Sequence, residues 1–381
     1  MGYDRMKRIL IVTGSRSDYG KLKQIALKLE QDRQFELFMF VTGMHLLNRY
    51  GATYKFVIKD GYKNIYLSKK IYNNTPMDIA LARNIANISA YVNEIHPDMI
   101  IVHGDRIEAL AAAIVGMLNN IYVSHIEGGE VTGTVDEKIR HAITKIVDFH
   151  FVSNDTAKKR VIQLGEDKNR IYVVGSPDID TMISEKLPKI ENIKTKNNIN
   201  FEKYAICIFH PVTTELDKIR ENTKKLVDAL IKSNYNYIII FPNNDMGSNY
   251  IEGEYKKIKN NEKFKIFASL EFEEFLTLLK NCEFVIGNSS IGIRECGIYG
   301  IPSINIGTRQ HNRADMHYQK NIQTIENIDS NKICEAITKI NSYRVKDKYF
   351  GDGHTSEKIL EILKNKEIWK LSIQKKFIDL L

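Results

Sequence analysis

The sequence predicts an α/β protein of two domains, each built on a parallel sheet. Short apolar runs rich in Ile, Val, Phe and Tyr alternate with segments of helical periodicity, which is the pattern of βαβ units. At 381 residues, 43% of them hydrophobic, the chain is long enough to bury two cores. The apolar periodicity disappears between residues 184 and 203, in a stretch rich in Lys, Asn and Glu, so we expect the domain linker there.

The strand pattern divides the chain at that point. We expect an N-terminal domain over residues 1–184, a C-terminal domain over 204–350, and a terminal helix within 351–381 that packs back on the N-terminal domain. Two similar domains facing each other across a cleft would bind a ligand between them. The expected strands are 8–13, 35–42, 99–103, 121–125, 149–153 and 171–174, then 204–209, 237–241, 265–267, 284–286 and 303–306.

Composition excludes several classes of function. The net charge of +8 is spread along the chain, which argues against a nucleic-acid surface but suits a small polyanionic ligand. The longest apolar run, 109–118, is too short to span a membrane, and there is no signal-peptide pattern, so we expect a cytoplasmic protein. The four cysteines form no C-x-x-C pair, and we interpret them as reduced and structural.

The first expected strand runs into a glycine-bearing turn, 13–21, that contains two cations, Arg16 and Lys21. The turn is not a P-loop, because its glycines are one residue too far apart and Leu22 stands where a Ser or Thr should be. It also lacks the G-x-G-x-x-G pattern, which argues against a nicotinamide dehydrogenase.

Carboxylates follow the next two strands of this domain. Asp105 and Arg106 come directly after strand 99–103, Glu127 follows strand 121–125, and Asp136 lies a few residues further on. Ligands bind beyond the carboxyl ends of parallel strands, so these groups should converge on one rim. Each alone is typical of a helix cap or a surface ion pair, but three clusters on adjacent strand ends favour a functional site.

A metal site is an alternative for the same rim. His103 and Asp105 share one strand face, as do His125 and Glu127, and His141 lies nearby in the sequence. Against this alternative, no H-E-x-x-H occurs, and no P-C-x-x-C accompanies the His125-x-Glu127 pair.

The second domain carries candidates for anion binding. His210 and Asn243 follow its first two strands. Ser289 and Ser290 follow Gly287 and should open a helix whose N–H groups hold a diphosphate. Glu295, about one turn into that helix, could accept hydrogen bonds from a ribose, although an exposed helical Glu is the commoner case.

With these segments in view, the chain resembles the hydrolysing UDP-N-acetylglucosamine 2-epimerases of bacterial sialic acid synthesis, over nearly its whole length. The resemblance implies two Rossmann-like domains of the GT-B type and a nucleotide held mainly by the second domain. It also implies no metal or nicotinamide cofactor, and a homodimer. The segments that carry it are ILIVTG (9–14), VTGMH (41–45, ending at His45), those around Asp105, Glu127 and Asp136, HPVT (210–213), GNSS (287–290) and GTRQ (307–310).

The resemblance assigns roles by motif match. Asp105, Glu127 and Asp136 would surround the sugar, with His210 as a fourth catalytic group, and His45 would help to bind the substrate. The UDP contacts would be Arg16, Lys21, Arg106, His210, Asn243, Ser289, Ser290, Glu295 and Arg309.

The chemistry explains why several carboxylates are needed. The hydrogen on C2 of an N-acetylhexosamine is not next to a carbonyl, so the bond from C1 to the diphosphate must stretch before a carboxylate can remove that proton. Water then adds to the glycal at C1 while C2 is reprotonated from the other face. We expect crowded carboxylates to push each other's pKa apart, so that one acts as acid and another as base.

Four alternatives remain open from the sequence. The same fold could act on a 2,4-diacetamido-2,4,6-trideoxyhexose carried by UDP or GDP, or could belong to the non-hydrolysing epimerases. A metal-dependent hydrolase and a non-catalytic nucleotide-sugar sensor are more distant possibilities.

Overall fold

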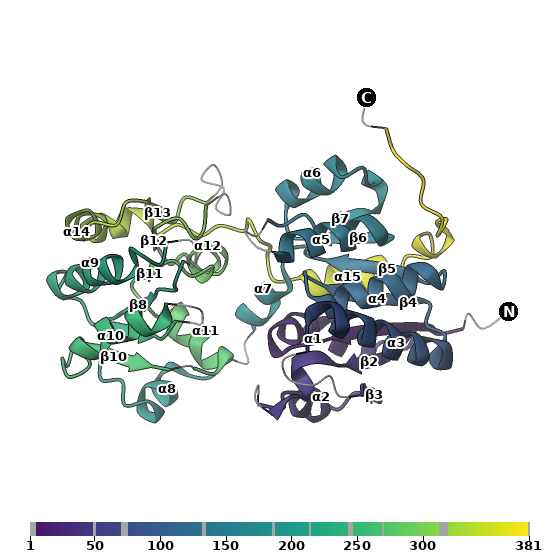
Figure 1. Ribbon diagram of the computed structural model, residues 1–381, viewed down its shortest axis with the longest axis horizontal. Coiled ribbons are helices and arrows are strands. Elements are labelled where there is room, and N and C mark those ends of the chain that lie inside the picture. Colours follow the sequence, from purple (N-terminus) through teal and green to yellow (C-terminus); the bar gives the residue numbers. More distant parts are fainter. Residues whose placement is uncertain are drawn as a thin grey trace. The chain divides into compact units, whose positions relative to one another are not determined.

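The computed structural model describes residues 5–48, 51–69, 75–131, 135–184, 187–212, 215–242, 247–268, 270–311 and 319–379. The chain forms two compact units, one of Met1–Ile183 with Phe350–Leu381 and the other of Ser184–Tyr349 (Figure 1). Each unit has its own parallel sheet, which confirms the predicted fold of two α/β domains. Among the described residues, no helix combines the length and the apolar character needed to cross a membrane.

The first unit is built on seven parallel strands in the order β3-β2-β1-β4-β5-β6-β7. The strands are β1 (Lys7–Thr13), β2 (Phe35–Val41), β3 (Asn64–Leu67), β4 (Met99–His103), β5 (Tyr122–Ile126), β6 (Phe149–Val152) and β7 (Ile171–Val173). The helices are α1 (Arg16–Gln31), η1 (Gly43–Leu46), α2 (Tyr54–Lys59), α3 (Met77–Ile95), α4 (Ile107–Leu118), α5 (Val135–Ile146), α6 (Asp155–Gln163), η3 (Lys168–Arg170), α7 (Pro177–Met182), α15 (Thr355–Lys364) and η5 (Ile368–Lys370).

Alternate residues of the central strand β1 enter two different cores. Ile9 and Ile11 pack with α1 and α15, whereas Leu10 and Val12 pack with α3 and α4. The sheet is therefore buried on both faces, which explains why its strands read as nearly continuous apolar runs. The yellow helix α15 of Figure 1 comes from the end of the chain, and its buried Leu363 completes the core beside α1.

A buried carboxylate anchors α15 to the rest of the first unit. Asp180, in α7, accepts hydrogen bonds from the backbone N–H groups of Thr355 (2.8 Å) and Ser356 (2.7 Å) at the start of α15. These N–H groups have no partner within the helix, so the carboxylate satisfies them and interacts favourably with the helix dipole.

The second unit is built on six parallel strands in the order β10-β9-β8-β11-β12-β13. The strands are β8 (Ala205–Ile208), β9 (Tyr237–Ile240), β10 (Phe264–Phe267), β11 (Val285–Gly287), β12 (Ser303–Ile306) and β13 (Ile322–Ile325). The helices are α8 (Ile190–Lys196), α9 (Ile219–Lys232), α10 (Ser248–Ile258), α11 (Phe272–Lys280), α12 (Ile291–Arg294), α13 (Cys296–Tyr299), α14 (Ser330–Thr338) and η4 (Ile340–Tyr343).

The structure differs from the sequence expectations in three places. Strands β3 and β13 were not expected, and each lies at an edge of its sheet, where side chains are only partly buried and the apolar pattern is weak. The expected linker contains helix α8, whose Ile193 is buried. A short helix with one buried side chain leaves too little apolar periodicity to detect.

Candidate active site

The carboxylate of Glu127 lies in a buried polar cluster at the carboxyl ends of β4 and β5. The parallel register pairs His103 with Ile126, so His103 lies beside the first residue after β5. Nε2 of His103 and Nζ of Lys21 are each 3.0 Å from Oε2 of Glu127, and Ser176 donates from its hydroxyl to Oε1. Glu127 is only 3% exposed. Its carboxylate is therefore held by donors from three separate elements.

The backbone of Glu127 is strained. Its φ of +61° lies in the left-handed region, which costs a non-glycine residue about 1–3 kcal/mol. The guanidinium of Arg140, in α5, donates to the backbone carbonyl oxygen of Glu127 at 2.8 Å. Such strain is characteristic of functional sites, where the surrounding bonds hold a side chain in one position.

Asp105 has a cationic partner of its own. The guanidinium of Arg140 that contacts the backbone of Glu127 also forms an ion pair with the Asp105 carboxylate. Asp136 lies in the first turn of the same helix, one turn before Arg140, and is half-buried. Arg140 thus brings Asp105 and Glu127 together, and both carboxylates face cations rather than only each other.

Lys21 links the Glu127 cluster to α7. Its Nζ lies 2.8 Å from Oδ2 of Asp178 as well as 3.0 Å from Glu127. Asp178 follows the cap residue of α7, Ser176, which is the residue that donates to Glu127. This Ser-Pro-Asp turn follows β7, so the rule that polar groups after parallel strands form the site identifies it as well.

The turn after β1 is tightly bonded within itself. Ser15 caps α1 in a capping box with Asp18. His45 lies between the hydroxyls of Thr13 (3.0 Å) and Thr53 (2.7 Å), so both ring nitrogens are engaged. Burial lowers the pKa of His45 below its ordinary value, and the imidazole holds neighbouring loops together.

The two arginines expected to bind substrate in this unit have different surroundings. Arg106 makes a two-pronged ion pair with Glu108, with N···O distances of 3.0 and 3.1 Å. A Cβ atom at Gly43, whose φ is +59°, would lie 2.3 Å from Oε1 of Glu108, so this pair needs glycine there. Arg16 is exposed and stacks over the ring of Phe56 at 5.3 Å.

The histidines considered as metal ligands are not equivalent. His125 is fully buried, with Nε2 2.7 Å from the carbonyl oxygen of Gly104 and Nδ1 3.1 Å from the hydroxyl of Thr144. Burial lowers the pKa of His125 well below its ordinary value. Both of its nitrogens are therefore committed to structural bonds, unlike those of His103.

In the second unit, a buried asparagine organises the strand ends. The side-chain amide of Asn288 accepts from the backbone N–H of His210 at 2.7 Å and donates to the carbonyl oxygen of His210 at 2.8 Å. Burial, with the nearby cation of Arg309, lowers the pKa of the His210 imidazole to about 4. His210 is consequently uncharged near neutral pH.

Gly287 allows β11 to approach β8 closely before Asn288. Its φ is +138°, and a Cβ atom there would lie 1.9 Å from the carbonyl oxygen of Ile208. The N–H of Asn288 donates to the same oxygen at 3.1 Å. Only glycine permits this geometry, which directs the Asn288 side chain toward His210.

The remaining candidates of this unit surround Asn288 or lie further along the chain. The carbonyl oxygen of Asn288 accepts from Arg309 (3.2 Å) and from Gln310 (2.9 Å). Ser289 and Ser290 directly precede α12, so a helix begins where the sequence predicted one, although α12 spans only four residues and its dipole is small. Glu295 lies at the junction of α12 and α13, and Asn243 lies outside the described residues.

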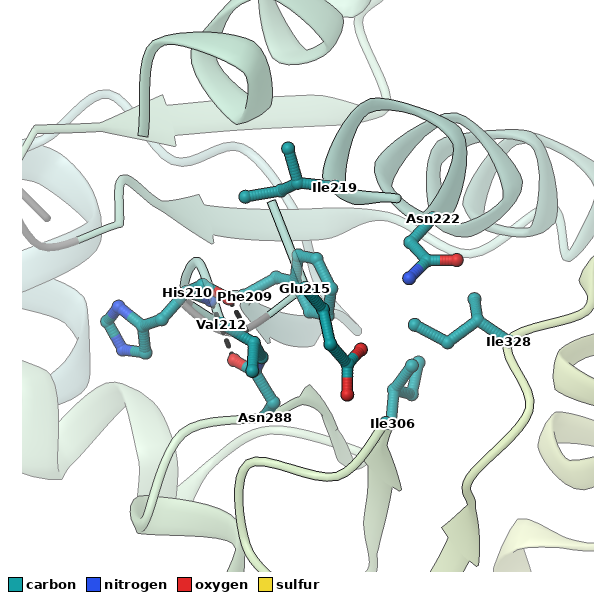
Figure 2. Close-up of a pocket in the computed structure, with 10 residues that line it drawn as sticks. Phe209, His210, Val212, Glu215, Ile219, Asn222, Asn288, Ile306 and Ile328 are labelled. Atoms are coloured by element: carbon teal, nitrogen blue, oxygen red, sulfur yellow. Dashed lines mark hydrogen bonds between the residues drawn. The ribbon is translucent and has the colours of Figure 1, made fainter. Parts of the chain in front are cut away.

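A pocket opens beside these groups at the carboxyl ends of β8 and β12. Figure 2 shows the side chains of Glu215 and Asn222 on one side of it, with the His210 ring directed away from them. The hydroxyl of Thr308 donates to Glu215 at 2.6 Å, which ties the two loops at the rim. The pocket is lined by Phe209, His210, Val212, Glu215, Ile219, Asn222, Asn288, Ile306, Gly307 and Ile328.

Comparison with known proteins yields consistent matches over nearly the whole chain. Residues 27–364 match a family model described as UDP-N-acetylglucosamine 2-epimerase. A Neisseria meningitidis serogroup B protein named UDP-N-acetylglucosamine 2-epimerase is 44% identical, over 98% of this chain and 100% of its own length. A Legionella pneumophila protein named UDP-N,N'-diacetylbacillosamine 2-epimerase (hydrolyzing) is 32% identical, over 94% of this chain and 96% of its own.

The fold has close counterparts among solved structures. A crystal structure of a Neisseria meningitidis UDP-GlcNAc 2-epimerase bound to UDP-GlcNAc aligns with a TM-score of 0.79, covering 93% of this chain and 99% of that one. The two sequences are 19% identical, so this match concerns the fold alone.

Proposed function

The chain belongs to the UDP-N-acetylglucosamine 2-epimerase family, and we propose that it is a hydrolysing member that converts UDP-N-acetylglucosamine to UDP and N-acetylmannosamine. The observation that carries the proposal is that Asp105 and Glu127 lie together at the ends of β4 and β5, where Arg140 pairs with the Asp105 carboxylate and donates to the backbone carbonyl oxygen of Glu127. The 32% identical Legionella relative, whose name includes the word hydrolyzing, supports the hydrolytic outcome.

The proposed reaction begins with loss of the diphosphate. The C1–O bond to UDP breaks with its electron pair going to the phosphate oxygen, while the C2–H bond breaks and its pair forms the C1=C2 double bond of a glycal. The C2 proton passes to the acid/base groups around Asp105, Glu127 and Asp136. Water then adds at C1, and C2 takes a proton from the other face, which inverts that centre.

The departing UDP would be stabilised from the strand ends of the second unit. Arg309, Ser289 and Ser290 are the proposed contacts there. His210 is uncharged near neutral pH because its pKa is lowered to about 4, so it would contribute as a hydrogen-bond donor rather than as a cation.

The test is proton NMR of the purified protein incubated with UDP-N-acetylglucosamine. We expect free UDP and N-acetylmannosamine in equal amounts, and deuterium at C2 of the product when the reaction runs in heavy water. A product that keeps UDP attached would contradict hydrolysis. An unlabelled C2 would contradict proton abstraction.

A second candidate substrate is UDP-N,N'-diacetylbacillosamine, which is favoured by the name of the Legionella relative. The same incubation with each nucleotide sugar, compared by kcat/KM, distinguishes the two. We favour UDP-N-acetylglucosamine because the 44% identical relative carries that name. N-acetylmannosamine would then supply sialic acid synthesis.

Two further expectations remain predictions. We expect a homodimer, to be measured by size-exclusion chromatography with light scattering. We also expect the protein to act in the cytoplasm, to be measured by cell fractionation.

A further inference from the structure

The surroundings of Glu127 suggest that this carboxylate works through a neighbour. Its Oε2 is 3.0 Å from both Lys21 and His103, and its Oε1 accepts from Ser176. A carboxylate held by three donors and 3% exposed is positioned to orient another group. Three of the roughly four lone-pair sites of this carboxylate are already engaged by its neighbours.

His103 contacts Glu127 with only one of its two ring nitrogens. Its Nε2 faces Glu127, whereas its Nδ1 has no hydrogen-bond partner within the part of the chain that the structure describes. When Nε2–H donates to Glu127, the neutral imidazole carries a lone pair on Nδ1. His103 is 9% exposed and lies two residues before Asp105, at the strand end where the proposed chemistry takes place.

His103 and His125 are bonded differently, although both lie in the central part of the sheet. The two histidines occupy neighbouring strands of the same sheet, but His125 is 0% exposed and has partners on both nitrogens. His150, in β6, also faces a carboxylate, that of Glu166, with its Nε2, but its side chain is 0% exposed. His103 has a carboxylate on one nitrogen only, the arrangement that orients an imidazole for proton transfer.

Charged groups of both signs surround the Glu127 carboxylate that faces His103. Lys21 contributes one positive charge, and Glu127 and Asp178 contribute one negative charge each, so the three groups sum to −1. The ion pair of Asp105 with Arg140 adds no net charge. Glu127 therefore belongs to a network of ion pairs that fixes the carboxylate oxygen facing His103.

We propose that His103 is the catalytic base that takes the C2 proton, and that Glu127 is a positioning residue that orients it; the proposal rests on the proposed function. The C2–H bond breaks, its electron pair forms the C1=C2 double bond, and the C1–O pair leaves with UDP. The proton binds Nδ1 of His103, which becomes an imidazolium paired with Glu127.

The test is a double-mutant cycle of His103→Gln and Glu127→Gln in the full chain. The glutamine amide can still donate to Glu127 but cannot take a proton. We expect H103Q to lower kcat by about 10²–10⁴-fold, the usual contribution of a positioned acid or base, with UDP affinity unchanged by calorimetry. When E127Q is added to the H103Q variant, kcat should fall little further, because the two residues act as one unit.

Three outcomes would overturn the inference. The first is a near-normal kcat in H103Q, and the second is a double variant whose fold-loss in kcat equals the product of the fold-losses in the two single variants. The third is a loss of UDP affinity together with kcat in H103Q. If H103Q does not fold, His103→Asn takes its place in the same cycle. Failure of the proposed function looks different, because the unmodified protein would then release no UDP from UDP-N-acetylglucosamine.

Discussion

The strand ends of the two units carry polar groups of different kinds. In the first unit they are charged side chains that pair with one another, such as Glu127 with Lys21 and Asp105 with Arg140. In the second unit several of them bond to backbone instead, such as the Asn288 amide around His210 and the Arg309 guanidinium on the carbonyl oxygen of Asn288. Carboxylates with fixed partners suit proton transfer, whereas donors on a rigid backbone suit the binding of an anion. The same fold thus supports two tasks through its loops.

The largest expected effect concerns the charged groups at the strand ends of the first unit. Asp105→Asn removes an acid/base group and the partner of Arg140, so kcat should fall by about 10²–10⁴-fold while UDP affinity is unchanged. Steady-state kinetics and calorimetry measure the two quantities. Glu367→Gln, an exposed acid paired with Lys370 in the same unit, is the control and should leave both unchanged. Loss of UDP affinity in D105N would contradict the division of tasks.

The next effect tests the rigid backbone of the second unit. Gly287→Ala would place a Cβ atom 1.9 Å from the carbonyl oxygen of Ile208, and we expect it to lower the free energy of unfolding by about 3–5 kcal/mol. Urea unfolding followed by circular dichroism measures it. Gly253→Ala in α10 meets no neighbouring atom and should instead add up to about 1 kcal/mol. Equal stabilities of the two variants would count against the close approach.

A smaller effect concerns the anion. Arg309→Gln removes the cation nearest the bond network of Asn288, and we expect the Kd for UDP to rise by about 10–100-fold, which corresponds to one or two lost charge-assisted hydrogen bonds. Calorimetry with UDP measures it. Lys339→Gln removes an exposed cation of the same unit that pairs with Glu335, and it should leave the Kd unchanged. An equal change in both variants would show that only net charge matters.

The smallest effect is a pH dependence of stability. The pKa of His210 is about 4 in the folded protein, below its ordinary value of about 6.5, so the unfolded chain binds this proton more readily. The contribution of uncharged His210 to stability is complete above about pH 6.5 and is lost as the pH falls toward 4. Between pH 7.5 and 5, this contribution to the free energy of unfolding should fall by about 2 kcal/mol. Over the same pH range, the free energy of unfolding of the His210→Gln variant should fall by that much less than the free energy of unfolding of the unmodified protein. Urea unfolding at both pH values measures the difference. Substitution of the exposed His96 by Asn should not change the difference.

The sequence by itself determined the fold class, the central strands and the placement of Asp105, Glu127 and His210 at strand ends. These features depend on local patterns, since buried parallel strands read as apolar runs and their carboxyl ends face the site. Edge strands β3 and β13 escaped detection because their partial burial leaves no such pattern.

Only the tertiary structure decided which polar groups meet. Lys21 and Glu127 are 106 residues apart, Ser176 and Glu127 are 49 apart, and His210 and Asn288 are 78 apart. Strand order and register bring such residues together, and no local pattern encodes them. That is why the carboxylates expected to crowd one another turned out to have cations of their own, and why His103 differs from His125 in ways that their equivalent places in the sequence do not reveal.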